Sequence, residues 1–271
     1  MVLELKSNLF FCEACLERKP LDTRSDDERY CSFCNNIIEE EKKTKVKVPF
    51  DYENSIGFVL GLNGSLPQIT ERYSLGNPVG SEGSFGMKPG FQGGAIMNLV
   101  LNRSMEAAFG LVYSQAKFKF TDTPFPFTSY DYEETQAHLR IPASLLFKLN
   151  PATNGASIYL RVGIVGDYLL SASGEGTRIY EGSTDQIVVE KTTISDSRTR
   201  LNILGDAGLG VRIPFEKSFM FMEAGFNAGL IKSNKAENRY RNDDLVWLLY
   251  HVDSDYMLMQ FSFSLGMAWN L

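Results

Sequence analysis

The chain has 271 residues, of which 44% are hydrophobic and 22% charged, the composition of an ordered protein with one large or two small domains. Its 27 Lys and Arg against 33 Asp and Glu give a net charge of −6. This is the wrong sign for a protein that binds nucleic acid through its phosphates, so we expect no nucleic-acid partner. No run approaches the roughly 18 uninterrupted apolar residues of a membrane-spanning helix, a test that does not detect membrane β-barrels.

The four cysteines lie near the N-terminus in the spacing C-x2-C-x15-C-x2-C, at Cys12, Cys15, Cys31 and Cys34. A two-residue gap lets both thiolates of a pair reach one ion from a single turn, as in zinc ribbons. Because four protein ligands complete a tetrahedral shell, we expect a closed structural zinc site rather than a catalytic one. Two disulfides are the alternative, which gains weight in an oxidising compartment.

A densely charged run from Glu39 to Lys47 separates the cysteines from a long region rich in glycine and aromatic residues. We therefore predict two domains. Residues 1–48 form a zinc-ribbon-like module with a charged linker, and residues 49–271 form the main domain. The module has few apolar residues, so metal binding would supply its folding energy.

Apolar and polar residues alternate with a period of two in the main domain, which indicates β-strands. The clearest segment is the last, where one face carries Met257, Met259, Phe261, Phe263, Leu265, Met267, Trp269 and Leu271. Similar alternation occurs in residues 137–149, 158–171, 201–213 and 220–230, and more weakly from Ile56, Phe91 and Met105. The pattern predicts eight antiparallel strands.

Short and long connections take turns between these segments. The short ones are residues 102–104, 150–155 and 215–218, and the long polar ones are residues 64–88, 121–132, 173–199 and 232–255. Tight periplasmic turns and long extracellular loops are typical of bacterial outer-membrane barrels. We therefore predict an all-β fold, an eight-stranded antiparallel up-and-down transmembrane β-barrel.

The polar face of the predicted strands is dominated by Gly, Ser, Ala and Asn, which suits a narrow barrel interior. Unpaired charges in such an interior are costly, so we expect the charges on this face to pair within the lumen. This predicted lumen charge network consists of Glu106, Asp167, Asp206 and Glu223 with Arg140, Lys148, Arg161 and Arg212. The alternative is a soluble, lipocalin-like barrel, whose apolar face would point inward.

Aromatic residues near the strand ends are expected to anchor the barrel at the two membrane interfaces. We predict Phe147, Phe215 and Trp269 at the periplasmic interface and Tyr113, Tyr168, Trp247 and Tyr256 at the outer one.

One run carries a family resemblance: His138-Leu139-Arg140-Ile141-Pro142-Ala143-Ser144-Leu145-Leu146-Phe147-Lys148, followed by Tyr159-Leu160-Arg161-Val162-Gly163 and Tyr168-Leu169-Leu170-Ser171-Ala172. It resembles the PorT-like, OmpA-like outer-membrane β-barrel domain family ("porin family" proteins), over residues 50–271. The resemblance implies a small barrel in a Gram-negative outer membrane, with the lipid bilayer as partner, and no particular activity. Residues 1–30 lack the apolar core of a secretory signal, so we expect a mis-assigned or fused start, or another export route.

Few groups of residues in the sequence suggest catalysis. The sequence has no P-loop, nucleophile elbow or H-E-x-x-H motif, and we expect His138 to be a satisfied interior histidine beside Arg140. The one group worth testing is His251, Asp253 and Asp255 in the last long connection. We predict that the protein is not an enzyme.

The predicted function is that of an integral outer-membrane barrel with a structural role, or with a binding role for a protein or surface ligand at its long loops. An eight-stranded interior is just filled by side chains, which disfavours diffusion of large solutes. Two alternatives stay open: a narrow channel or porin for small solutes, and a soluble zinc-ribbon protein with a lipocalin-like barrel.

Overall fold

The computed structural model describes residues 9–12, 17–20, 53–73, 75, 83–125, 127–149 and 155–271. The chain divides into two compact units, Met1–Asp51 and Tyr52–Leu271. In the first unit, β1 (Leu9–Cys12) pairs antiparallel with β2 (Glu17–Pro20), and Cys12 lies opposite Glu17. Cys15, Cys31 and Cys34 lie outside the described residues, so the four-cysteine zinc site stays a prediction.

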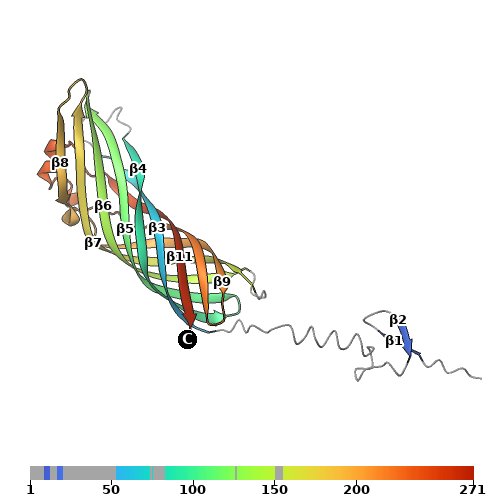
Figure 1. Ribbon diagram of the computed structural model, residues 1–271. Helices are drawn as coiled ribbons and strands as arrows, with labels where there is room; N and C mark the ends of the chain where they lie inside the picture. Colours follow the sequence, from blue (N-terminus) through green and yellow to red (C-terminus); the bar gives the residue numbers. More distant parts are fainter. Residues whose placement is uncertain are drawn as a thin grey trace, which may run out of the picture. The chain divides into compact units, whose positions relative to one another are not determined.

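The second unit is a closed antiparallel barrel of eight strands (Figure 1). These are β3 (Ser55–Glu71), β4 (Ser84–Asn102), β5 (Met105–Phe125), β6 (Thr128–Lys148), β7 (Ser157–Tyr180), β9 (Leu201–Pro214), β10 (Ser218–Gly229) and β11 (Asp255–Asn270). Each strand pairs with its neighbour in sequence, except that β7 pairs with β9 past the short β8, and pairing of β11 with β3 closes the barrel. The predicted up-and-down barrel is confirmed.

The short connections lie at one end of the barrel, as predicted. Arg103 and Ser104 form the turn between β4 and β5, and residues 215–217 join β9 to β10. Leu271 N donates to Asn54 O at 2.8 Å, so the last residue lies beside the start of β3 at this same end. This is the periplasmic end of an outer-membrane barrel.

At the opposite end the strands run far beyond the predicted bounds. β5 and β6 each have 21 residues and nearly meet, so the predicted loop over residues 121–132 is wrong. A strand of this length spans about 70 Å, whereas about 9–11 tilted residues cross a bilayer. The polar residues that suggested a loop are instead the outward face of a sheet that continues into solvent.

The predicted loop over residues 173–199 is also mostly sheet. β7 continues to Tyr180, and β8 (Gln186–Thr193) pairs with its upper part beside the barrel (Figure 1). The short helices η2 (Ser195–Ser197), η3 (Ala236–Asn238) and η4 (Asp244–Leu248) complete this end. We call β8, these helices and the upper ends of β5, β6 and β7 the extracellular cap.

The outer wall of the barrel is apolar around its lower part. Leu60 and Leu62 on β3 are 61% and 67% exposed, a degree of exposure that large apolar side chains show where they face lipid. On β5 the outward series changes from apolar to polar between Tyr113 and Gln115, and Gln115 lies opposite Ala137 on β6, where the same change occurs. Both strands therefore leave the membrane at one height.

The extracellular cap has a hydrophobic core of its own. Its buried residues are Phe120, Tyr130, Tyr132, Leu169, Ala172, Val189, Ile194, Leu245 and Leu249. Tyr256 at the start of β11 is buried and shares the inward direction of Gln260, so its predicted place at the outer lipid interface is wrong. The cap is a packed structure rather than a set of separate loops.

Candidate functional site

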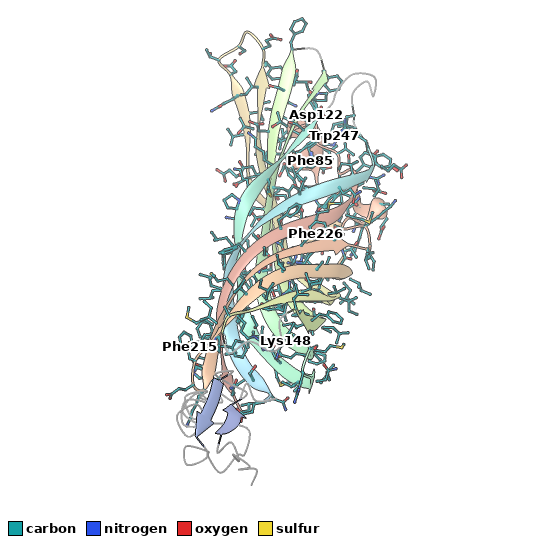
Figure 2. All side chains as sticks on the ribbon, turned by 90° about the vertical axis from the view of Figure 1, so that its right-hand side faces the viewer. Phe85, Asp122, Lys148, Phe215, Phe226 and Trp247 are labelled. Carbon is teal, nitrogen blue, oxygen red and sulfur yellow. The ribbon has the colours of Figure 1, made fainter. Side chains whose placement is uncertain are left out.

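Inward-facing side chains fill the lumen with polar groups between the two ends of the barrel. Figure 2 shows Lys148 and Phe215 near the periplasmic end and Asp122 and Trp247 near the extracellular end. The alternation of the strands places every member of the predicted lumen charge network on the inner face. These eight residues form three groups, which we call the lower, middle and upper layers.

The lower layer consists of Glu106, Arg212 and Lys148. Nη1 and Nη2 of Arg212 donate to the two carboxylate oxygens of Glu106, both at 2.8 Å, and Lys148 Nζ lies 2.5 Å from Glu106 Oε1. The guanidinium of Arg212 also lies 4.0 Å from the ring centroid of Phe219. All three charged side chains are less than 10% exposed, so the layer is shielded from solvent.

The middle layer is built around Arg161, which bridges Asp206 and Glu223. Its Nη2 donates to Asp206 at 2.8 Å, and Nη1 forms an ion pair with Glu223. Ser144 donates to Asp206 at 2.8 Å, and Tyr159 donates to Glu223 at 3.1 Å. Two carboxylates thus share one cation and two hydroxyl donors, which spreads the cost of burying them.

Tyr159 reaches Glu223 because its cross-strand neighbour on β9 is Gly210. A Cβ at Gly210 would lie 2.2 Å from the Tyr159 ring. Glycine therefore lets the ring lie flat on the inner wall.

The upper layer joins Arg140 and His138 through one carboxylate. Arg140 Nε donates to Asp167 Oδ1 at 2.8 Å, and His138 Nδ1 lies 2.8 Å from Asp167 Oδ2. Arg140 also donates to Gln260, which in turn donates to Ser65 at 3.2 Å. His138 is thus an interior histidine with polar partners.

Above these layers lies a buried group centred on Arg198, of which only Asp253 was among the predicted candidate residues. Its Nε and Nη2 donate to the two oxygens of Glu134, both at 2.6 Å, and Nη1 and Nη2 donate to Asp253 at 2.6 and 2.8 Å. Tyr132 donates to Glu134 at 2.9 Å, and the Arg198 side chain is 1% exposed. We call Arg198, Glu134 and Asp253 the cap triad.

Two members of the triad, Arg198 and Asp253, stabilise each other's charged forms. Burial opposes the ionisation of Asp253, but Arg198 and His251 outweigh it and hold the pKa of this carboxyl well below its usual range. Burial likewise opposes the charge of Arg198, yet Asp253 and Glu134 raise the pKa of its guanidinium well above the usual value. Arg198 and Asp253 therefore remain ionised at neutral pH.

The predicted group of His251, Asp253 and Asp255 is divided between two places. His251 Nε2 lies 3.4 Å from Asp253 Oδ1, and its ring stacks on Tyr132 at 3.9 Å. Asp255 instead accepts hydrogen bonds from Lys232 at 2.6 Å and Asn234 at 2.9 Å. The three side chains do not converge on one point, and His251 is buried.

Across the parts of the chain that the structure describes, no three His, Cys, Asp or Glu side chains gather where they could hold a metal ion. The described helices are also all too short or too polar to cross a bilayer.

A lipid-facing apolar wall, a polar lumen and short turns at one end define the class of transmembrane β-barrels of bacterial outer membranes. The family model for the outer membrane protein beta-barrel domain matches residues 50–235, and the chain belongs to this family. The protein is therefore located in the bacterial outer membrane. The PorT-like part of the sequence resemblance stays a prediction.

Solved outer-membrane barrels are among the similar structures. OprG from Pseudomonas aeruginosa is 7% identical with a TM-score of 0.44, and the alignment covers 81% of this chain and 97% of OprG. Neisserial surface protein A is 10% identical with a TM-score of 0.36, covering 80% and 97% of the two chains. Ail of Yersinia pestis is 11% identical with a TM-score of 0.30, covering 81% and 99%. No curated protein matches the sequence.

Proposed function

We propose that this protein is a closed outer-membrane barrel that binds a partner at the cell surface through its extracellular cap, and that it neither catalyses a reaction nor conducts solutes. The observation that carries the proposal is the succession of buried ion pairs along the lumen. Buried ion pairs of the lower layer lie at the periplasmic end and those of the cap triad at the extracellular end, and we take both as barriers. A path for solutes would have to break both.

The cap supports the binding role because it is folded in advance. Its core ties η4 and β8 to the upper sheet through Leu245, Leu249 and Val189. Phe127 and Trp247 are nevertheless 71% and 64% exposed at this end. Exposed aromatic side chains on a rigid surface are frequent anchors for partners, since little entropy is lost on binding.

A narrow channel is the second candidate, because a cavity of about 90 Å³ lies between the layers. Planar-bilayer recording separates the two functions. The closed barrel predicts no conductance for the wild-type protein and a loss of stability in Asp206→Ala, which removes a partner of Arg161. Steady conductance of the wild-type protein, altered by Asp206→Ala, would support the channel instead.

We also propose that Cys12, Cys15, Cys31 and Cys34 hold a structural zinc ion. Cys12 ends β1, and Cys15 follows within the four residues before β2 begins at Glu17. A C-x2-C pair suits a zinc knuckle. Bound zinc would draw the two cysteine pairs together and supply folding energy. Zinc content near one ion per chain supports this proposal, whereas no zinc and no free thiols would indicate disulfides.

A further inference from the structure

The cavity in the lumen lies above the lower layer and is lined by Arg161 and Asp206 of the middle layer and Arg140 of the upper layer. It measures about 90 Å³. About 10–15 Å³ of such space is enough for one water molecule, so several waters or one small organic molecule fit. This cavity is not needed for a closed barrel, and its walls have an unusual composition.

One wall of the cavity is apolar although the surrounding lumen is polar. It is formed by Val59, Val112 and Phe221, which pack in one cluster together with Ile96. Phe221 lies opposite Gly266 on β11, where a Cβ would come within 2.1 Å of the ring. The ring is therefore held against the inner wall and leaves the space in front of it free.

The facing wall is charged and carries an excess of donors. The lining holds Arg140, Arg161 and Arg212 with Asp206 and Glu223, while Asp167 and Glu106, which do not line the cavity, pair with Arg140 and Arg212. Each arginine keeps one buried N–H group without an acceptor, at Nη2 of Arg140 and at Nε of Arg161 and Arg212. No buried acceptor among the described lining side chains is left without a partner. The wall therefore has spare hydrogen-bond donors and no spare acceptor.

We propose that this cavity binds a small amphiphilic carboxylate. Its carboxylate would accept hydrogen bonds from Arg140 and Arg161, and its short apolar chain would lie against Val59, Val112 and Phe221. A carboxylate suits these donors because a buried guanidinium N–H gains most from a charged acceptor. The carboxylate would enter past one of the two end groups, the lower layer or the cap triad, and would not cross the lumen, so its binding does not require solute conduction.

The first test uses isothermal titration calorimetry on the refolded full-length protein in detergent, with butyrate as the probe. Butan-1-ol has the same chain without the charge, and acetate has the charge with a shorter chain. We expect saturable butyrate binding at one site, with both comparison molecules about tenfold weaker or more. Absence of saturable butyrate binding, or equal binding of butan-1-ol, would overturn the proposal and leave a cavity that holds water only.

The second test locates the site with two neighbouring alanines of β5. Ala108 lines the cavity, so Ala108→Leu fills it, whereas Ala107 has the opposite, outward direction and Ala107→Leu changes only the lipid-facing wall. We expect Ala108→Leu to weaken butyrate binding about tenfold or more and Ala107→Leu to leave it unchanged. Equal affinity in both variants would contradict the site. Should Ala108→Leu not refold, Ile96→Phe narrows the same cavity and takes its place.

Discussion

The guanidinium of Arg198 forms a two-point contact with the carboxylate of Glu134, with both donor–acceptor distances at 2.6 Å. The two residues are 64 positions apart in the sequence. Arg198 comes from the segment before β9 and Glu134 from β6, and Asp253 joins them from the segment before β11. One side chain therefore ties three separate parts of the cap across the mouth of the barrel.

Replacing Arg198 should destabilise the cap strongly. Arg198→Met keeps most of the volume but leaves Glu134 and Asp253 buried without a cation. Removing one partner from a buried ion pair costs about 3–5 kcal/mol. The free energy of unfolding, measured by urea titration of the refolded protein with tryptophan fluorescence, should fall by this amount.

The matched control is Arg200→Met, two residues further along. The Arg200 side chain is 57% exposed and lies 4.0 Å from Asp196. Exposed pairs of this kind contribute about 0–1 kcal/mol, so the control should unfold nearly as the wild type does. Equal losses in both variants would show that the triad does not hold the cap.

Stability should fall in acid because of Asp253. The pKa of its carboxyl is lowered in the folded protein, whereas an unfolded aspartate titrates near about 3.9. A lowered folded pKa means that its contribution is present above the unfolded value and is lost as the pH falls towards the folded one. We expect the free energy of unfolding to decline below about pH 5.

The variant Asp253→Asn should flatten that decline, since an asparagine has no proton to gain. Asp196→Asn is the control, because Asp196 lies on the surface, 67% exposed. Urea titrations between neutral and acidic pH compare the slopes. An unchanged slope in Asp253→Asn would assign the acid sensitivity to other carboxyls.

The barrel and its lumen could be predicted from the sequence because both depend on a local pattern. In β11 an apolar residue follows every small or polar one, and small residues on the polar face favour a strand that separates lipid from a narrow interior. The charges Glu106, Asp206 and Arg212 occur at inward positions of the same pattern. The period of two along each strand is enough to assign these residues to the inner face. It does not identify which residues they pair with.

The cap could not be predicted in the same way. Arg198 lies in a polar stretch that resembles a loop, and nothing near it in the sequence indicates Glu134 or Asp253 as its partners. The alternation of Tyr130, Tyr132 and Glu134 continues that of the membrane-spanning part of β6. This continued alternation was the signal that the strand extends beyond the membrane. It was missed because the outward residues that alternate with these three are polar, which is also typical of a loop.

The position of the membrane boundary predicts different costs for charges along one strand. Leu111 on β5 lies within the apolar outer band and is 51% exposed, whereas Thr121 lies on the polar part of the same strand. An arginine on the lipid-facing wall costs about 2–4 kcal/mol near the bilayer centre and about 0–1 kcal/mol near the interface. Leu111→Arg should therefore lower the free energy of unfolding in lipid vesicles, and Thr121→Arg should not. If both variants lowered the free energy of unfolding by similar amounts, the outer membrane boundary would lie nearer the extracellular end, beyond Thr121.

The last prediction concerns Pro142, which interrupts the pairing of β5 with β6. Phe109 pairs with Ala143 and Val112 with Arg140 in one unbroken register, but no pair forms between them. On its other side Pro142 pairs with Val165 of β7, so the interruption is confined to the β5–β6 contact. Proline has no N–H group to donate, which explains the missing pairs.

Pro142→Ala should restore the donor and raise the free energy of unfolding by about 0.5–1.5 kcal/mol, the net contribution of one hydrogen bond. Pro214→Ala at the end of β9 is the control, since a strand end has no ladder bond to regain. Urea titration in lipid vesicles measures both variants. A loss of stability in Pro142→Ala would mean that the ring's packing against Gly110, where a Cβ would lie 3.2 Å from it, contributes more than the hydrogen bond.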